Sequence, residues 1–433
     1  MRPGDTELRG LKIPGAILLV VAACVACGGG QGGPDPVQRP TPALPVQPAP
    51  LSANAQAMLE DVARLRGLAP PEGFKAGYVT RAQLPAVLAN AITAEDRSWF
   101  ARTTTLYRLL GYIGPGDDFF AIYQAFANEA VSGLYEPSRR TAWVVVTDAM
   151  GGFEALTQGE RATLAHEFLH AVQDGRFGLE SAAKRARDDH DQDIGLAALV
   201  EGDAVTHERL FSGRGGMVPG LHLLFADVGG SPPGIPAAIE RAFRFPYGAG
   251  ADWVSALRER GGTAAIDRLF EAGPPATATI LHGAGDGAPA PQPGLPGLDR
   301  VLGAGWRRES GGALGEFEWQ NFLLQRVRAL DAATAAAGWT ADRYEVLVRG
   351  GSSLLVARVS CRDDDAASTL RHALRGWADA AGLVTAQRSR YTLAEAKGSN
   401  TMAVDAGGGR EVVLVIGTGR NDVEAAIAAL TGG

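Results

Sequence analysis

The first stretch with regularly spaced apolar residues runs from about 56 to 130. Met58 and Val62 stand one helical turn apart there, and similar spacings recur, which indicates a mostly helical region. The pattern then changes to two runs rich in β-branched and aromatic residues, 130–135 and 141–147, separated by Glu-Pro-Ser. Two such runs around turn-forming residues predict a β-hairpin.

Two longer helices are predicted after the hairpin. The first begins near Thr157, whose spacing to Glu160 matches a capping box, and it continues without proline to Gln173. The second extends from Asp191 to about Leu210. Because the first of these helices has few polar positions, we expect it to lie in or beside a core.

The last third of the chain has a different order of elements. Residues 283–300 are rich in Gly and Pro and mark a boundary. Beyond it we expect a helical stretch around 314–337, strands at 344–348, 353–359, near Tyr391 and at 411–416, and helices at 366–380 and 421–430. This pattern predicts a smaller C-terminal α+β domain, so the chain as a whole belongs to the α+β class.

The N-terminus has the features of a targeting signal. Basic residues precede a short apolar stretch at 13–26 that ends in small residues. Val-Ala-Ala-Cys, which ends at Cys24, resembles the bacterial lipobox, whose cysteine is lipidated, and Cys27 is a second candidate. An ordinary secretory signal with incidental cysteines is the alternative. Residues 28–55 are rich in Gly, Pro and Gln and predict an extended tether, so we expect an extracytoplasmic protein, lipid-anchored in the cell envelope or secreted.

Composition narrows the range of partners. The 433-residue chain is 46% hydrophobic and 21% charged, which suits a folded protein. Its net charge is -7 and its Lys and Arg residues are not clustered, so we expect no nucleic-acid partner. Two of the three cysteines lie in the N-terminal apolar segment, so we expect no structural disulfide, and we expect Cys361 to be an inert thiol.

The predicted helix that begins near Thr157 contains His-Glu-Phe-Leu-His, from His166 to His170. Residues four apart share one face of a helix, so both imidazoles can ligate one Zn²⁺ while Glu167 can reach a metal-bound water. A solvated helix face with two ordinary histidines is the alternative, but apolar residues surround the motif. The HExxH spacing therefore predicts a zinc site.

A catalytic zinc ion needs a third protein ligand. Glu201 lies in the second predicted helix among alanines and beside Gly202, which allows close approach of another backbone. A carboxylate among small apolar residues is costly unless it is paired or bound to metal, so we expect Glu201 to be the third ligand. A buried ion pair with an Arg is the alternative use of Glu201. Asp203 and His207 are fallback ligands, or outer groups that orient the imidazoles.

The helix that carries His166, Glu167 and His170, followed by Glu201 on another helix, resembles the gluzincin arrangement of thermolysin-like zinc metallopeptidases. Other segments resemble a poorly characterised family of bacterial secreted or lipid-anchored HExxH proteins, among them 133–137, 166–174, 198–204 and 245–248. One departure from thermolysin is clear: its third ligand belongs to a Glu-x-x-x-Asp pattern, whereas position 205 here is Val and the nearby acid is Asp203.

The resemblance implies a zincin-like metallopeptidase region with a β-hairpin edge strand, the HExxH helix and a glutamate helix. We therefore divide the chain into a lipoprotein signal peptide at 1–27, a tether at 28–55, the metallopeptidase domain at 56–300, and a C-terminal helical segment with an α+β domain at 301–433. The strand at 141–147 is the expected edge strand for an extended peptide.

The implied reaction is hydrolysis of a peptide bond in a peptide or protein substrate. Zinc polarises the carbonyl, and Glu167 takes a proton from the zinc-bound water and delivers it to the leaving amine. Tyr247 is the first choice as oxyanion donor, with His207 and His222 behind it, although Tyr247 as a packing residue is an equal alternative. The rival function is a zincin-like envelope binding protein with structural or no zinc.

Overall fold

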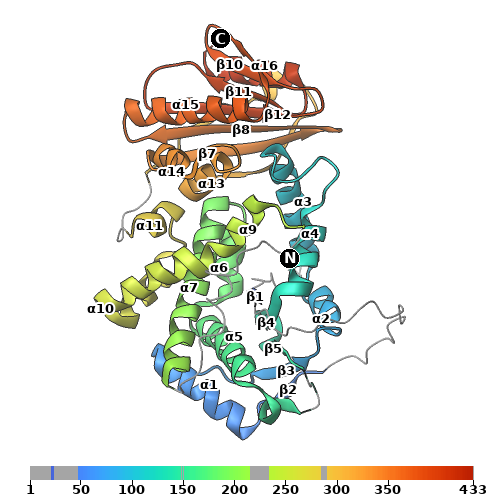
Figure 1. The fold of residues 1–433 in the computed structure, drawn as a ribbon, viewed down its shortest axis with the longest axis vertical. Coiled ribbons are helices and arrows are strands. Elements are labelled where there is room, and N and C mark those ends of the chain that lie inside the picture. The colour runs from blue at the N-terminus through green and yellow to red at the C-terminus, as the bar shows by residue number, and fades with distance from the viewer. Residues whose placement is uncertain are drawn as a thin grey trace, which may run out of the picture.

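The computed structural model describes residues 21–23, 47–147, 149, 151–214, 234–283 and 290–432. The described residues form an elongated molecule of two lobes, each built on its own sheet (Figure 1). The first lobe comprises the described residues up to 283, and the second comprises 290–432. Helices and strands are mixed in both, which confirms the predicted α+β class.

A five-stranded sheet with strand order β1-β4-β5-β3-β2 forms the base of the first lobe. Its strands are β1 (Val21–Ala23), β2 (Ala49–Pro50), β3 (Lys75–Val79), β4 (Val131–Glu136) and β5 (Thr141–Val145). Only β3 and β5 run parallel; the other neighbours in this sheet are antiparallel. The predicted hairpin is β4 and β5, but the predicted edge strand is wrong, because β3 pairs with the other side of β5.

Helices cover both faces of this sheet. One face packs on α1 and α5 through side chains such as Leu59, Val144 and Phe168. The opposite face, which includes Leu134 and Trp143, contributes to the core around α2, α3 and α4. The helical elements of this lobe are α1 (Ala53–Arg66), α2 (Leu84–Ala91), α3 (Ala94–Leu109), α4 (Phe119–Ala130), η1 (Pro137–Arg139), η2 (Gly152–Ala155), α5 (Gln158–Phe177), α6 (Leu179–Ala186), α7 (His190–Arg214), α9 (Ala237–Arg244), the π-helical turn η3 (Pro246–Gly250), α10 (Ala251–Ala272) and α11 (Thr277–His282).

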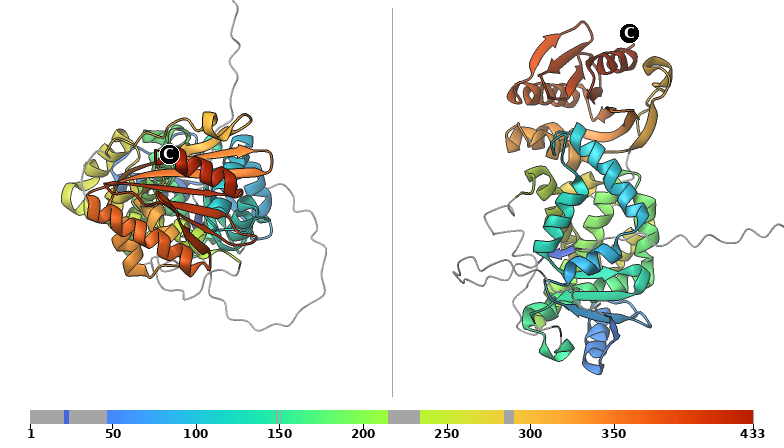
Figure 2. Two further views of the ribbon diagram at one scale, coloured as in Figure 1. Left: turned by 90° about the horizontal axis from the view of Figure 1, so that it is seen from above. Right: turned by 90° about the vertical axis from the view of Figure 1, so that its right-hand side faces the viewer.

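The second lobe contains a seven-stranded sheet with strand order β6-β7-β8-β12-β11-β10-β9. Helix α15 packs on one face of this sheet, and α16 packs on the other together with α12. Figure 2 shows this sheet and its helices at the end of the molecule away from the first sheet. The elements are α12 (Asp299–Leu302), β6 (Arg307–Gly312), α13 (Gly315–Leu323), α14 (Ala329–Ala336), β7 (Trp339–Arg349), β8 (Ser352–Cys361), α15 (Asp364–Ala380), β9 (Val384–Gln387), β10 (Tyr391–Glu395), β11 (Thr401–Asp405), β12 (Glu411–Gly417) and α16 (Arg420–Leu430).

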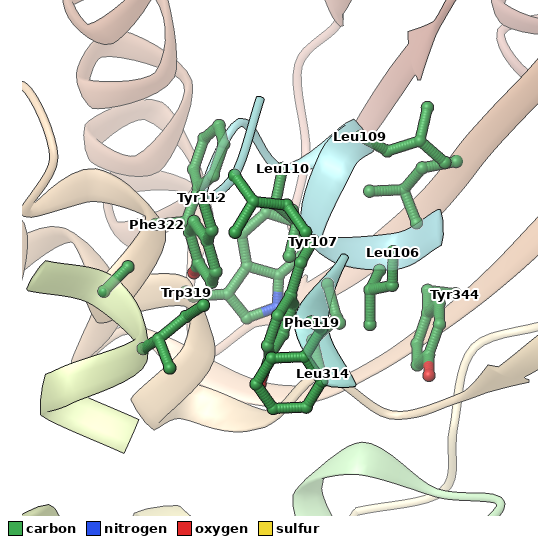
Figure 3. Close-up of a cluster of buried hydrophobic side chains, with 14 of the residues drawn as sticks. Leu106, Tyr107, Leu109, Leu110, Tyr112, Phe119, Leu314, Trp319, Phe322 and Tyr344 are labelled. Carbon is green, nitrogen blue, oxygen red and sulfur yellow. The ribbon is translucent and has the colours of Figure 1, made fainter. Parts of the chain in front are cut away.

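The two lobes share one apolar core. The C-terminal end of α3 inserts its side chains between α13 and the start of the second sheet, so that Tyr107 and Leu110 lie among Trp319, Phe322 and Tyr344 (Figure 3). All of these side chains are nearly inaccessible to solvent. Helix α3 therefore belongs to the packing of both lobes.

Some sequence predictions fall on residues that the structure does not describe. Cys24, Cys27 and most of the signal peptide and tether lie outside the described ranges, as does His222. The short strand β1 lies within the predicted signal peptide and pairs with β4. No helix of the described ranges has both the length and the apolar character needed to cross a membrane.

Candidate metal centre

Helix α5 carries the HExxH residues and forms where the sequence predicts it. Thr157 and Glu160 make the reciprocal capping box, in which each side chain accepts a hydrogen bond from the other residue's backbone N–H. The helix continues one turn past the expected end, to Phe177, and stops at Gly178, which adopts the left-handed conformation. His166, Glu167 and His170 are all fully buried, which excludes the solvated helix face.

Helix α7 brings Glu201 to the same place, and glycines set how closely it packs. A Cβ on Gly250 would lie 2.6 Å from the carbonyl oxygen of Ala198, and a Cβ on Gly202 would collide with the carbonyl of Gly250. Only glycine at both positions therefore allows α7 and the turn η3 to approach this closely. The packing holds Glu201 of α7 and Tyr247 of η3 near one another.

The structure brings together the three predicted ligands. The Nε2 atom of His166 lies 3.2 Å from Oε2 of Glu201, and Nε2 of His170 lies 3.6 Å from the same oxygen. Ligand atoms from all three residues lie within 4.8 Å of one another, and theirs is the sole such group found among the described residues. A tetrahedral zinc site with bonds near 2.0–2.1 Å separates its ligand atoms by about 3.3 Å, so the donor set fits this ion.

Hydrogen bonds on the outer side of each imidazole fix which nitrogen faces the group. Nδ1 of His170 donates to Oε1 of Gln173 at 2.8 Å, and Nδ1 of His166 lies 3.3 Å from Oε2 of Glu208. Both Nε2 atoms are thereby directed toward Glu201. Metal-binding histidines commonly use their second nitrogen in this way, because the outer partner sets the tautomer and the ring orientation.

The outer partners extend into a buried network. Nε2 of Gln173 donates to the Val200 carbonyl and to Oδ2 of Asp203, each at 3.0 Å, and Arg66 donates to the same Asp203 oxygen at 2.8 Å. Asp203 also pairs with Nδ1 of His207 at 2.9 Å. The fallback ligands Asp203 and His207 therefore do not join the candidate ligand group, and Asp203 instead supports Gln173 from behind.

Glu167 differs from its neighbours because both of its carboxylate oxygens are buried and accept no hydrogen bond from the described residues. Its surroundings are shaped by Gly133 on β4, where a Cβ would collide with Oε1 of Glu167 and lie 2.6 Å from Cγ2 of Thr163. Burial raises the pKa of Glu167 well above its ordinary value. A buried carboxylate without a partner is unfavourable, so this arrangement calls for a ligand or a proton.

The electrostatics favour the zinc-binding protonation state at Glu201 and His170 but not at His166. Burial acts to lower the pKa of His166, but its hydrogen bonds with Glu201 and Glu208 outweigh burial and raise that pKa well above its ordinary value, so zinc must displace a proton there. Burial acts to raise the pKa of Glu201, but the adjacent His170 and His166 outweigh it and lower that pKa to about 2. Burial lowers the pKa of His170, which keeps its Nε2 lone pair available, and that atom has no hydrogen-bond partner in the described structure. An ionised carboxylate and a neutral imidazole are the forms that bind zinc.

Tyr247 reaches the group from η3. Its ring stacks on that of His166 with centroids 6.5 Å apart, and its hydroxyl donates a hydrogen bond to Glu201. Burial raises the pKa of Tyr247 well above its ordinary value, so the hydroxyl stays a donor at neutral pH. Tyr247 therefore lies at the candidate metal centre, as expected from the sequence, and its ring also packs against that of His166.

Sequence reasoning missed Gln173 and Glu208 as partners of the histidines. Both carry a positional signal: Gln173 follows His170 by three residues, and Glu208 lies two helical turns beyond Glu201 on the same face of α7. Gly133 carried no such signal, because its role depends on how β4 crosses α5. A comparison of the chain with protein-family models, curated proteins and solved structures found no match.

Proposed function

We propose that the protein is a zinc metallopeptidase of the gluzincin type, with His166, His170 and Glu201 as ligands and Glu167 as the general base. The observation that carries this proposal is the carboxylate of Glu167, which is buried beside three convergent ligands and has no hydrogen-bond partner among the described residues. A purely structural zinc site has no use for such a group, whereas a general base must keep its lone pairs free.

Each residue of the proposed site has a separate role in the reaction. A bound zinc ion supplies Lewis acidity, which polarises a carbonyl and makes water a stronger acid. Glu167 accepts the proton of the attacking water and passes it to the leaving amine. The Tyr247 hydroxyl, which is held by η3, donates to negative charge that develops on the substrate carbonyl oxygen. Glu208 and Gln173 hold the two imidazoles in the required orientation.

Strand β4 is the proposed docking edge for the peptide. It lies next to Glu167 through Gly133, and its side away from β5 pairs with the short strand β1. Cleavage of a signal peptide before Cys24 would remove β1 and leave this edge open. An extended substrate can then add to β4 as an antiparallel strand, using main-chain hydrogen bonds that do not depend on its sequence.

The proposal includes an extracytoplasmic location, with a lipid on Cys24 and the following residues as a tether. It is supported by the apolar segment and lipobox-like sequence alone. Fractionation of cells that express the Cys24→Ala variant tests it, because the anchored protein should move from the membrane to the soluble fraction. If Cys27→Ala is the variant that moves, the lipid is on Cys27.

The test of function compares the mature protein, purified after cleavage of the signal peptide, with its Glu167→Gln and Glu201→Ala variants. Wild type should bind one zinc ion per chain and hydrolyse an unfolded protein substrate. Glu167→Gln should retain zinc and lose about 10²- to 10⁴-fold in turnover, and Glu201→Ala should lose zinc. Metal content by mass spectrometry and peptide release are the two measurements, and Glu129→Gln, an exposed change on α4, is the matched control.

Two results would contradict the proposal in different ways. One bound zinc with no hydrolysis by wild type or Glu167→Gln would favour an envelope binding protein with a structural metal. Unchanged zinc content in Glu201→Ala would reject Glu201 as a ligand while leaving the histidines in place.

A further inference from the structure

A cavity of about 200 Å³ opens beside the candidate metal centre, with Glu201 and Tyr247 in its wall. It lies between α3, α4, α7 and α9 and is smaller than the roughly 300–1,000 Å³ of typical small-molecule sites. A space of this size, next to the proposed scissile bond, suits one large side chain of a bound peptide. This use of the cavity rests on the proposed peptidase function.

Aromatic residues of α3, α4 and α9 form one large part of the cavity wall: Trp99, Phe100, Phe119, Tyr123, Phe126 and Phe243. Aromatic side chains form an apolar lining that accepts the stem of a long side chain. Their faces also carry negative electrostatic potential and attract cations. The lining therefore admits an aliphatic stem and tolerates a positive charge at its tip.

The cavity runs along one face of α7. Asp193, Ala197 and Glu201 all line it and follow each other at i, i+4 and i+8, so Asp193 lies about 12 Å from Glu201 along the helix axis. Ala197 leaves room between the two carboxylates. Only a long side chain can extend from a peptide bond near Glu201 to Asp193.

Among the described residues, the charges around the cavity leave the carboxylate of Asp193 without a close partner. Arg187 pairs with Asp96 at 2.7 Å, and His190 pairs with Glu318 at 2.7 Å. No hydrogen bond or ion pair joins the side chain of Asp193 to another residue that the structure describes, although the charges of His190 and Arg187 act on it from a distance. Burial raises the pKa of Asp193, which shows that its charge is poorly solvated.

The lining contains a second polar group without a partner. The hydroxyl of Tyr123 is buried and makes no hydrogen bond within the described part of the chain. A hydroxyl can accept as well as donate, so together with Asp193 it offers the cavity two acceptors. Two unused acceptors in an apolar cavity favour a ligand group rich in N–H donors.

We propose that this cavity is the specificity pocket of the enzyme and that it selects an arginine or lysine side chain next to the scissile bond, with Asp193 as its counter-ion. The aromatic wall packs on the aliphatic stem, as long cationic side chains bury their stems and keep their charge paired. Asp193 is a specificity-determining residue and has no part in the chemical step.

The experiment uses the mature, zinc-loaded protein, purified after cleavage of the signal peptide. One set of peptides varies the residue before the cleaved bond and a second set varies the residue after it, in each case with Arg, Lys, Phe, Leu or Ala. Wild type should show the highest kcat/KM for Arg and Lys. Asp193→Asn should lower kcat/KM for these two by about 10- to 100-fold, the loss of a charged hydrogen-bond partner, and leave the Ala peptide unchanged. Asp252→Asn, an exposed change on α10, is the matched control.

A second variant covers the case in which Asp193→Asn does not fold. Ala197→Leu should block the pocket midway, so that Arg and Lys peptides lose cleavage while Ala peptides keep it. A wild-type preference for Phe or Leu over Arg would overturn the inference, and so would an unchanged Arg-to-Ala ratio in both variants. If no peptide is cleaved beyond the Glu167→Gln background, the failure belongs to the proposed function.

Discussion

Buried carboxylates are used differently in the two lobes. In the second lobe, the Nε–H of Arg371 is shared between the two carboxylate oxygens of Asp405, at 3.0 and 3.2 Å, and Asp405 also accepts from two backbone N–H groups. Asp342 accepts from the backbone of Leu314 and Gly315 and from the indole of Trp339. In the first lobe, Glu167 is as deeply buried and accepts none from the described residues.

This contrast separates structural from functional polar groups. A protein that surrounds a carboxylate with donors has used it to hold elements together, and that group has no capacity left for a ligand. A carboxylate left without donors in a buried position lowers stability, and it persists where a ligand or reaction needs it. By this criterion, the chemical step is expected at Glu167 and ligand binding at the half-buried Asp193, whereas Asp405 and Asp342 hold the second lobe together.

The largest effect on stability should come from removing a buried carboxylate whose hydrogen-bond donors are all present. Asp405→Ala leaves the buried Arg371 guanidinium without its ion-pair partner, so the free energy of unfolding should fall by about 3–5 kcal/mol. Glu167→Gln replaces a buried carboxyl group that accepts no hydrogen bond from the described residues, so the metal-free protein should be as stable as wild type or more stable. Urea denaturation followed by tryptophan fluorescence measures both, with the exposed Asp379→Ala as control. A greater loss for Glu167→Gln than for Asp405→Ala would reverse the comparison.

A smaller effect is expected where the backbone makes room for Glu167. Gly133→Ala places a methyl group against Oε1 of Glu167 and Cγ2 of Thr163, so stability should fall by about 1–3 kcal/mol and peptide hydrolysis should fall with it. Gly159→Ala on α5 is the control, because a Cβ there meets nothing within 4 Å. Full activity in folded Gly133→Ala would show that the position of Glu167 does not depend on β4.

The smallest effect is expected for the side chain of Gln173 in the first lobe, which is fully hydrogen-bonded. Gln173→Ala removes the acceptor for Nδ1 of His170, so zinc affinity should fall about 10- to 100-fold. The same three side chains should still hold the zinc ion. Competition with a chelator measures the affinity, and the exposed Gln192→Ala on α7 is the control. An equal shift in both variants would mean that Gln173 does not orient the ligand.

Much of the candidate centre could be predicted because its signals are local. The capping box fixes where α5 begins, and the i, i+4 spacing then places His166 and His170 on one face. Glu201 stands out because a charged residue among alanines and beside a glycine needs a partner. Each of these inferences depends on one helix and its immediate neighbours in the sequence.

The rest depends on contacts between distant segments. Strand β3 is a short run within a helical region, and its pairing with β5 is what moves the predicted edge strand to the middle of the sheet. The cavity is assembled from α3, α4, α7 and α9, so no spacing along the chain indicates that Trp99 and Asp193 line the same space. Long-range pairing of this kind leaves no periodic signal in a single sequence.

Helix α3 connects the proposed specificity pocket to the second lobe. Its first half supplies Trp99 and Phe100 to the cavity wall, and its last turns are embedded in the core of the second lobe (Figure 3). A helix of this length is a rod of about 24 Å, so the seven-stranded sheet fixes where that wall stands. A truncated protein that ends before residue 301 would keep every proposed zinc ligand, but it would lose the core that holds the end of α3 and so positions the wall of the proposed specificity pocket.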